Sequence, residues 1–272
     1  NTTLGKMAVD VFIGMSGFLM SGSLVFQNGS TVRFWISRVL RIYPLLILTI
    51  FGIVFLVAPL VASVTYNEYY SSMLTYKYLI LNSTVIFGFF DELPGLFSSN
   101  PFPVSVNGVL WTISVEIRAY LMIFLIFKLA LRINIKQIYL RYFYLVPSLY
   151  FFVLYQQNDL HIQYRLYSLF FLGAFLSFFN LRSMKLRYIA LFLALSNILS
   201  FLYTPQFFDL TFAFSSPLIV LTLAYVRSVP SQMKTRLGDI SYGIYLFHFF
   251  IQQCFVSLVE FDSAWELILW SA

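Results

Sequence analysis

Glu116 is the residue whose position in this sequence most strongly indicates chemistry. It lies inside an apolar stretch, and Thr112 and Tyr120 stand four residues before and after it, on the same face of a helix. An ionisable group within a membrane helix is costly and therefore predicts a function. A carboxylate here can take a proton, orient a histidine or pair with a buried arginine. A structural pair with Arg118 is the alternative, but a two-residue offset points the two side chains to different sides of the helix.

A second polar face lies near the C-terminus. Ser241, Tyr245, His248 and Gln252 recur at helical spacing, so they form a continuous stripe that should face protein rather than lipid. His248 is placed to shuttle a proton within the membrane. A histidine that only holds helices together is an equally good interpretation of the same stripe.

An acidic residue and small residues share one face of the first apolar run. Asp10 opens this run, and Gly14, Gly17 and Ser21 follow it at helical spacing. Small residues let a neighbouring helix approach closely, so this face predicts a close-packing groove. The role of Asp10 stays open at this point.

A group of arginines precedes the second apolar run. Arg38 and Arg41, three residues apart, can face the same way and clamp a phosphate at the cytoplasmic surface, with Arg33 nearby. Pro44 suits the first turn of the helix that follows. Ordinary anchoring on the cytoplasmic side needs only positive charge and is the alternative.

The composition shows what kind of protein must position these residues. Hydrophobic residues make up 60% of the 272 residues and charged residues only 10%, against about 25% charged in soluble domains. The net charge of +6 is spread in short groups between apolar runs, which membrane orientation requires, so nucleic-acid binding is not expected. Cys254 is the single cysteine, which excludes an intrachain disulfide and a cysteine-based metal cluster. No metal site is predicted.

Long apolar runs predict an all-α, polytopic transmembrane helix bundle. A span needs about 20 apolar residues. Eight runs approach this length: Met7–Phe26, Ile42–Val64, Trp111–Leu131, Ile138–Tyr155, Tyr164–Phe179, Tyr188–Tyr203, Leu210–Val226 and Ile240–Leu258. A ninth begins near Ala264 and is cut off at Ala272. Tyr78–Phe90 is short for a span, so it is predicted to be re-entrant or interfacial.

The charges test this division independently. Basic residues concentrate in alternate connections, at 33–41, 128–141, 182–187 and 227–236, whereas most acids, including Asp159 and Asp209, fall in the intervening ones. Because Lys and Arg are enriched on the cytoplasmic side, the first run should enter from outside. Asn1 would then lie outside and the last run would stop part-way across. The chain is therefore expected to be trimmed from a longer protein at both ends.

Four stretches, in this order, cover nearly the whole chain: VDVFI with SGFL at 9–19, RVLRIYP at 38–44, NGVLWTISVE at 107–116 and LGDISYGIYLFH at 237–248. They resemble the segments VDxFF…SGFL, RxxRIYP, NGSLWTLPVEV and LGxISYxxYLxH of the membrane acyltransferase 3 family. Each segment alone is a weak pattern in apolar sequence. Four in the family's order are strong evidence of a resemblance.

The resemblance implies a ten-helix, multi-pass enzyme of the bacterial inner membrane. Residues 1–272 would form one transmembrane acyltransferase domain that lacks the first helix and the end of the last. Members of the family move an acyl group, usually acetyl, from cytoplasmic acyl-coenzyme A to a sugar hydroxyl outside or on a membrane intermediate. The family's essential histidine, with an arginine upstream, lies on the first helix, and no residue here matches either. The fragment itself is therefore expected to be inactive.

The resemblance also implies roles for the residues above. Arg33, Arg38 and Arg41 would hold acyl-coenzyme A, a co-substrate rather than a bound cofactor. Glu116 or Asp10 would orient the histidine or relay its proton. The residues expected to line the interior near the acyl group are His248, Tyr245, Ser241 and Thr112.

The expected partners are membrane lipid, acyl-coenzyme A and a glycan acceptor that stacks on the aromatic outer stretch Glu68–Asn107. Two other functions fit the same residues. A transporter or flippase also has a polar-lined bundle with intramembrane acids, and a non-catalytic partner subunit fits the absence of the essential histidine. The acceptor, the acyl chain length and the oligomeric state do not follow from the sequence.

Overall fold

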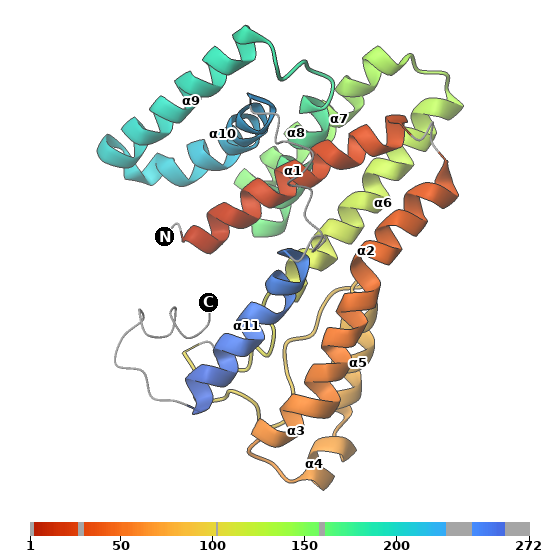
Figure 1. The fold of residues 1–272 in the computed structure, drawn as a ribbon, viewed down its shortest axis with the longest axis vertical. Coiled ribbons are helices and arrows are strands. Elements are labelled where there is room, and N and C mark those ends of the chain that lie inside the picture. The colour runs from red at the N-terminus through yellow and green to blue at the C-terminus, as the bar shows by residue number, and fades with distance from the viewer. Residues whose placement is uncertain (1–2, 27–29, 102, 158–160, 227–240, 259–272) are drawn as a thin grey trace. The chain divides into compact units, whose positions relative to one another are not determined.

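The computed structural model describes residues 3–26, 30–101, 103–157, 161–226 and 241–258. These residues form helices and connecting loops without a strand, which confirms the predicted all-α fold (Figure 1). The chain divides into two compact units. Unit 1 comprises Asn1–Phe34 and Arg118–Lys234, and unit 2 comprises Trp35–Ile117 and Thr235–Ala272.

Among the described residues, 6 helices are long and apolar enough to cross a membrane. They are α1 (Leu4–Phe26), the continuous helix formed by α2 (Thr31–Phe51), η1 (Gly52–Val57) and α3 (Ala58–Val61), α6 (Leu110–Arg132), α7 (Gln137–Gln157), α9 (Met184–Tyr203) and α10 (Pro205–Val226). Two shorter apolar helices are α8 (Ile162–Leu176) and α11 (Ser241–Leu258), and two further short helices are α4 (Tyr66–Ser71) and α5 (Met73–Thr84). Every one of the eight long apolar runs is therefore helical. The ninth, from Ala264, lies outside the described residues.

The start of the second predicted span was wrong. The helix begins at Thr31, so the three arginines are helical and Pro44 lies inside the helix rather than in its first turn. The continuous helix of 31 residues is about 47 Å long at 1.5 Å per residue, which exceeds a hydrocarbon core of about 30 Å. Its first turns can therefore carry charge, and a proline is tolerated inside a membrane helix.

The predicted start of the Leu210–Val226 run was late. Asp209 was counted with the connection before that run, together with the helix ends that flank it. The helix α10 in fact begins at Pro205, and only Thr204 separates it from α9. Proline suits a first helical position because its missing N–H would have no partner there. Asp209 is therefore helical, and its carboxylate contacts Arg165 of α8 and Lys6 of α1 within unit 1.

The helix α9 of unit 1 has the polarity of a lipid-facing helix. Its buried residues are Ala190, Asn197 and Ser200, whereas large apolar residues such as Phe192 are exposed. Asn197 Nδ2 donates to Ser215 Oγ on α10 at 2.7 Å.

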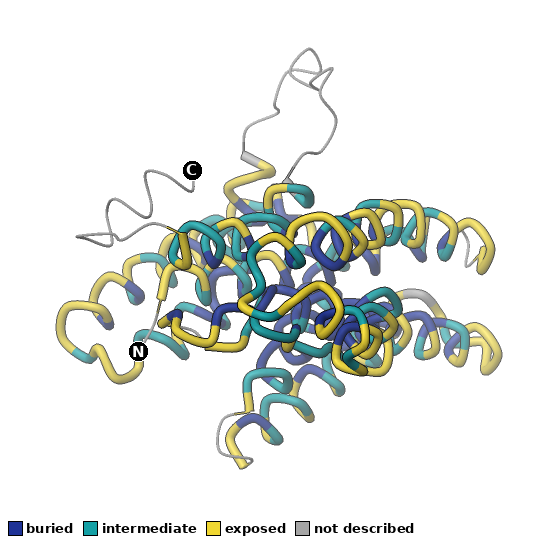
Figure 2. Tube along the Cα trace, turned by 90° about the horizontal axis from the view of Figure 1, so that it is seen from below, coloured by how far each residue is buried: buried dark blue, intermediate teal, exposed yellow. Residues whose placement is uncertain are grey.

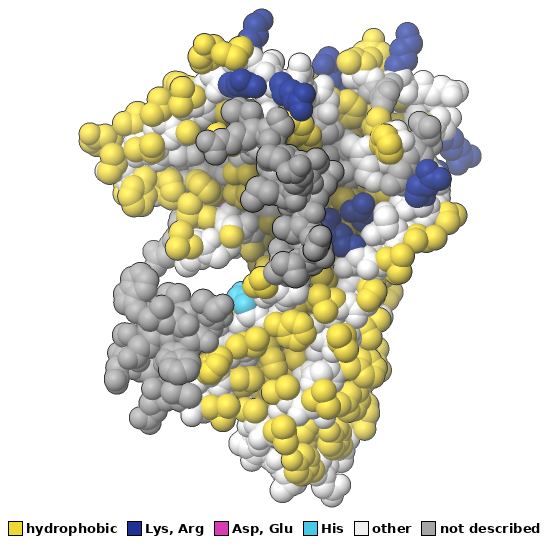
Figure 3. All heavy atoms as spheres, viewed as in Figure 1, with side chains coloured by type: hydrophobic (Ala, Val, Ile, Leu, Met, Phe, Trp, Pro, Cys, Tyr) yellow, Lys and Arg dark blue, Asp and Glu magenta, His cyan; other side chains and the backbone are white. Residues whose placement is uncertain are grey.

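Figure 2 shows how far each described residue is buried, with buried residues in dark blue and exposed residues in yellow. Hydrophobic side chains cover much of the visible face of the helices in Figure 3, where no acidic side chain is visible. Apolar groups outside and polar groups inside are what a bilayer requires.

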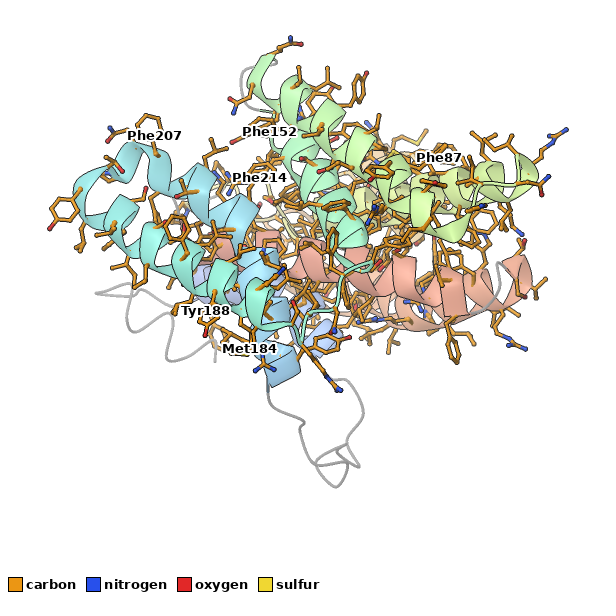
Figure 4. All side chains as sticks on the ribbon, turned by 90° about the horizontal axis from the view of Figure 1, so that it is seen from above. Phe87, Phe152, Met184, Tyr188, Phe207 and Phe214 are labelled. Atoms are coloured by element: carbon orange, nitrogen blue, oxygen red, sulfur yellow. The ribbon has the colours of Figure 1, made fainter. Side chains whose placement is uncertain are left out.

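Unit 1 is held together by close helix contacts around α8. This helix packs against α1, α7 and α10. A Cβ on Gly17 would overlap the backbone of Phe170, and a Cβ on Gly173 would overlap the carbonyl of Gly14. The close-packing groove predicted for Gly14 and Gly17 is therefore confirmed, since only glycine permits this approach. On the other side of the unit, Phe152 of α7 meets Phe214 of α10 with ring centroids 5.0 Å apart (Figure 4).

In unit 2 the chain between α3 and α6 runs back along the long helix. The Tyr43 hydroxyl of α2 donates to the carbonyl of Thr84, the last residue of α5, at 2.9 Å. Val85 then adopts a left-handed conformation, and the chain returns until Gly95 accepts from the Ser63 N–H beyond α3, at 2.9 Å. The stretch Tyr78–Phe90 is thus part helix and part return loop, and it is too short to form a span of its own.

The charge-based topology makes a direct prediction for unit 1. In a Cys254→Ser background, a cysteine at Asn180 should react only with reagents that enter the cytoplasm. One at His161, which is exposed at the start of α8, should react from outside. The 15 residues of α8 span about 22 Å, so this is the helix whose crossing most needs the test. Labelling of both positions from the same side would contradict the topology.

Candidate functional site

The start of α6 meets α11 in unit 2 through two hydroxyl groups. Thr112 Oγ1 and the Tyr245 hydroxyl form a short hydrogen bond. The carbonyl of Val109 lies 2.8 Å from Thr112 Oγ1 and 3.5 Å from the Tyr245 hydroxyl. Each hydroxyl has one proton, and the carbonyl can only accept. The two hydroxyls and this carbonyl therefore form one hydrogen-bonded cluster between the start of α6 and α11.

Glu116 lies one turn further along α6 and only 6% of it is exposed. Its charge acts on the hydroxyls of Tyr245 and Tyr242 on α11. The charge of Arg41 also acts on Tyr242, whose hydroxyl donates to the carbonyl of Ile42 on α2 at 3.3 Å. The structure thus brings the carboxylate, the arginine turn and the α11 stripe, three separate sequence motifs, into one neighbourhood.

His248 has a defined ring orientation. Its Nδ1 lies 2.8 Å from the carbonyl oxygen of Tyr245. Because a carbonyl only accepts, Nδ1 carries the hydrogen in the neutral ring, and the lone pair is on Nε2. The ring centroids of the two residues are 5.8 Å apart. A half-buried imidazole is therefore placed one turn from the Thr112–Tyr245 pair, with Nε2 as its other ring nitrogen.

The other predicted members of these faces have different surroundings. Tyr120, on the face of Glu116, forms a 3.0 Å hydrogen bond with Ser16 of α1 inside unit 1. Gln252 is half-buried on α11. The side chain of Ser241 lies outside the part of the chain that the structure describes. The face of α6 thus contacts α11 at Thr112 and contacts α1 at Tyr120, two turns later.

The predicted donor arginines lie along α2. Arg33 and Arg41 are exposed and Arg38 is half-buried, with its Nε 3.3 Å from Ser37 Oγ. Arg38 and Arg41 are one helical turn apart, so their guanidinium groups leave the same side of the helix. That spacing can place two planar forks on one phosphate or on neighbouring phosphates.

A charge network inside unit 1 was not predicted. Arg165 of α8 is fully buried and binds both carboxylate oxygens of Asp10, with Nε 3.1 Å from Oδ1 and Nη2 in contact with Oδ2. Its Nη1 contacts Asp209 of α10 and lies 3.4 Å from the Tyr155 hydroxyl of α7. Lys6 Nζ reaches Asp209 at 2.7 Å, on the side where both groups are partly exposed. Two cations and two anions balance one another across α1, α7, α8 and α10.

This network bears on the role of Asp10. A carboxylate held by a guanidinium through two N–H bonds is committed to that partner. The geometry favours helix assembly over proton relay for Asp10. Arg165 was overlooked although it stands inside the run Tyr164–Phe179, where an arginine that needs an acidic partner is itself a signal.

The segment of residues 66–107, between α3 and α6 of unit 2, has acidic and aromatic side chains; it is called the outer segment below, after its predicted side of the membrane. Burial raises the pKa of the Asp91 carboxyl, a hydrogen bond with Ser105 opposes this, and the charge of Glu92 adds to the rise. The exposed aromatic side chains of the segment include Tyr66, Tyr76 and Phe87, of which Phe87 is 85% exposed (Figure 4). Carboxylates and aromatic faces are the groups that contact sugar hydroxyls and sugar rings.

Comparison with known families gave one result. A family model described as an acyltransferase domain, that of the acyltransferase 3 family, matches residues 1–272. Comparison with curated proteins and with solved structures gave no match.

Proposed function

We propose, from the premise that this chain belongs to the acyltransferase 3 family, that it moves an acetyl group from cytoplasmic acetyl-coenzyme A to a glycan hydroxyl. The reaction would take place in a bacterial inner membrane, with the acceptor at the cell surface or on a membrane intermediate. One observation carries the proposal. The charges of Glu116 and Arg41 both act on Tyr242 of α11, and Thr112 is bonded to Tyr245 of the same helix, so groups suited to phosphate binding and to proton transfer face one helix of unit 2.

The donor side rests on the α2 arginines. Coenzyme A carries several phosphate charges, and planar guanidinium groups bind phosphate in a bidentate manner. Arg38 and Arg41 would hold these phosphates, with Arg33 nearer to the start of α2. Tyr242 ties α11 to this turn of α2 through its bond to Ile42. The acyl end of the donor would then lie toward Thr112 and Tyr245.

The chemistry requires a base. A sugar hydroxyl must lose its proton as it attacks the thioester carbon, and the thiolate of coenzyme A leaves. His248 Nε2 carries a lone pair, and Glu116 is placed to stabilise a cation that forms nearby. The family resemblance implies a different histidine as the essential base. In that case Glu116 would orient that histidine, and His248 would line the acyl site.

The acceptor side rests on the outer segment of unit 2. Asp91, Glu92 and the exposed aromatic side chains would bind hydroxyl groups and sugar faces there. A transport function predicts movement of substrate without coenzyme A. Binding of acetyl-coenzyme A to the full-length protein, followed by transfer of labelled acetyl to a glycan, tests the proposal. Transport of glycan with no effect of coenzyme A would contradict it.

The donor site makes a quantitative prediction. Arg38→Ala or Arg41→Ala in the full-length protein should weaken acetyl-coenzyme A binding by roughly ten- to hundredfold, because a charge-assisted phosphate contact contributes about 1.5–3 kcal/mol. Lysine should rescue only in part, since it keeps the charge without the planar fork. Titration calorimetry measures the change, and Arg182→Ala at an exposed turn of unit 1 is the control. Full affinity in the Arg38→Ala/Arg41→Ala double variant would exclude this site.

A further inference from the structure

Asn107 joins the two helices that carry the candidate site. It is fully buried, and its Nδ2 donates to the carbonyl of Leu246 on α11 at 2.9 Å. Its own carbonyl accepts from the N–H of Leu110, the first residue of α6, at 3.2 Å. Leu246 directly follows Tyr245. One amide therefore ties the start of the helix that bears Glu116 to the helix that bears the hydroxyl stripe.

The next residue shows how closely the two segments approach. A Cβ on Gly108 would lie 3.0 Å from Cζ of Phe249 and 3.1 Å from Ser105 Oγ. Real side chains rarely tolerate such contacts, so glycine allows the backbone to lie against α11 at this point. The Asn107 bond and the Gly108 contact, on adjacent residues, hold the start of α6 against α11.

Stability alone does not explain an amide at this position. Asn107 Oδ1 is buried and has no hydrogen-bond partner in the described part of the chain. A buried acceptor without a partner costs more than one ordinary hydrogen bond contributes. Leucine has the same branched shape and the same number of side-chain heavy atoms, and it would avoid that cost. The amide is therefore suited to setting a geometry rather than to raising stability.

A second amide contact on the same loop and helix provides a comparison. Asn100 Nδ2 lies 3.0 Å from both the carbonyl and Oε1 of Gln253 on α11. Gln253 Nε2 in turn donates to the carbonyl of Ser105 at 2.6 Å. Gln253 lies seven residues beyond Leu246, about 10 Å further along α11. In this contact the donors Asn100 Nδ2 and Gln253 Nε2 both have acceptors, and it lies away from the site.

We propose that Asn107 is a positioning residue for acyl transfer, setting the register of Thr112 and Glu116 against Tyr245 and His248. The inference rests on the proposed function and adds to it the device that aligns the two halves of the site. The two amide contacts should therefore differ in their effects. Loss of the Asn107–Leu246 bond should disturb the geometry of the site, whereas loss of the Asn100–Gln253 contact should lower the stability of the fold.

The test compares Asn107→Leu with Asn100→Leu in the full-length protein. Asn107→Leu should keep the wild-type melting temperature and the KM for acetyl-coenzyme A and for the acceptor, with kcat lower by about 10²-fold, the effect of a small misplacement. Asn100→Leu should lower the melting temperature and leave the kcat of the folded fraction unchanged. A wild-type kcat in Asn107→Leu, or an equal loss of kcat in the folded fraction of Asn100→Leu, would overturn the proposal.

The variant Asn107→Asp adds a measurement, the pH dependence of kcat, that a change in packing alone would not alter. When protonated, its carboxyl still donates to the Leu246 carbonyl, whereas the ionised form repels that carbonyl. Its kcat relative to wild type should therefore rise as the pH falls. A ratio that stays constant with pH would count against the Leu246 contact as the positioning bond.

A structural measurement keeps the inference independent of the assay. In a Cys254→Ser background, spin labels at Trp111 and Ile244 report the spacing of α6 and α11. Their distance distribution should broaden in Asn107→Leu and stay narrow in Asn100→Leu. If the wild type transfers no acetyl but this difference is seen, the proposed function fails and the positioning device stands. An unchanged distribution in Asn107→Leu overturns the device itself.

Discussion

Replacing Arg165 by methionine is expected to remove most of the folded protein from the membrane. Arg165 is fully buried and pairs with Asp10, which is also fully buried, and with Asp209. Removing one partner from a buried pair costs about 3–5 kcal/mol because it leaves a charge without compensation. That is a large share of a typical stability of about 5–15 kcal/mol. The fraction of monodisperse protein after detergent extraction, at equal expression, measures the effect.

Two further variants define the cause. Lys6→Met removes the outer cation of the same network, where the side chains are 30% and 24% exposed. A pair of this kind contributes about 0–1 kcal/mol, so little change is expected. The double variant Asp10→Asn/Arg165→Met removes both buried charges and should recover much of the abundance, since a buried pair can often be replaced by neutral groups. An Arg165→Met protein as abundant as the wild type would show that the pair does not hold unit 1 together.

The rescued double variant also tests the role of Asp10. If abundance and acetyl transfer both return, Asp10 has no part in the chemistry and serves to assemble α1 with α8. If abundance returns without transfer, Asp10 orients or relays for the reaction. The geometry favours the first outcome, because the guanidinium already occupies both carboxylate oxygens.

The positions of the helices could be predicted from the lengths of the apolar runs, because a bilayer requires spans of a minimum length. The structure forms helices in those places. The ends of the runs were less certain for a physical reason. An apolar run ends where a charged residue stands, but the helix that contains the run can continue past that residue. The second run was therefore started at Ile42, although the arginines before it continue the same helix. The run at Leu210 was started late for the same reason, although α10 already begins at Pro205.

The candidate site was likewise predictable only in part. Residues on one helix, such as Thr112 with Glu116 or Tyr245 with His248, were paired by helical period alone. The contacts between helices were not predictable from period. The bond from Asn107 to Leu246 depends on how the outer loop of unit 2 returns along α11. The pairing of Arg165 with Asp10 depends on the crossing of α1 and α8 at their glycines.

The second large effect is expected at Glu116. It is 6% exposed, it lies one turn from Thr112, and its charge acts on the hydroxyls of Tyr242 and Tyr245. Glutamine keeps the size and hydrogen-bonding capacity of the side chain but loses its charge and its ability to take a proton. If Glu116 orients a histidine or stabilises its cation, Glu116→Gln should fold normally and bind acetyl-coenzyme A normally. Its acetyl transfer should fall by about 10²-fold or more.

A structural role predicts a different pattern from the same substitution. If Glu116 mainly balances a buried cation, the neutral side chain leaves that cation uncompensated, and abundance should fall first. Measuring abundance, donor binding and transfer on one preparation separates the two roles. Near-normal transfer in Glu116→Gln would remove this residue from the mechanism. Lower abundance with normal turnover of the surviving protein would assign it to helix assembly instead.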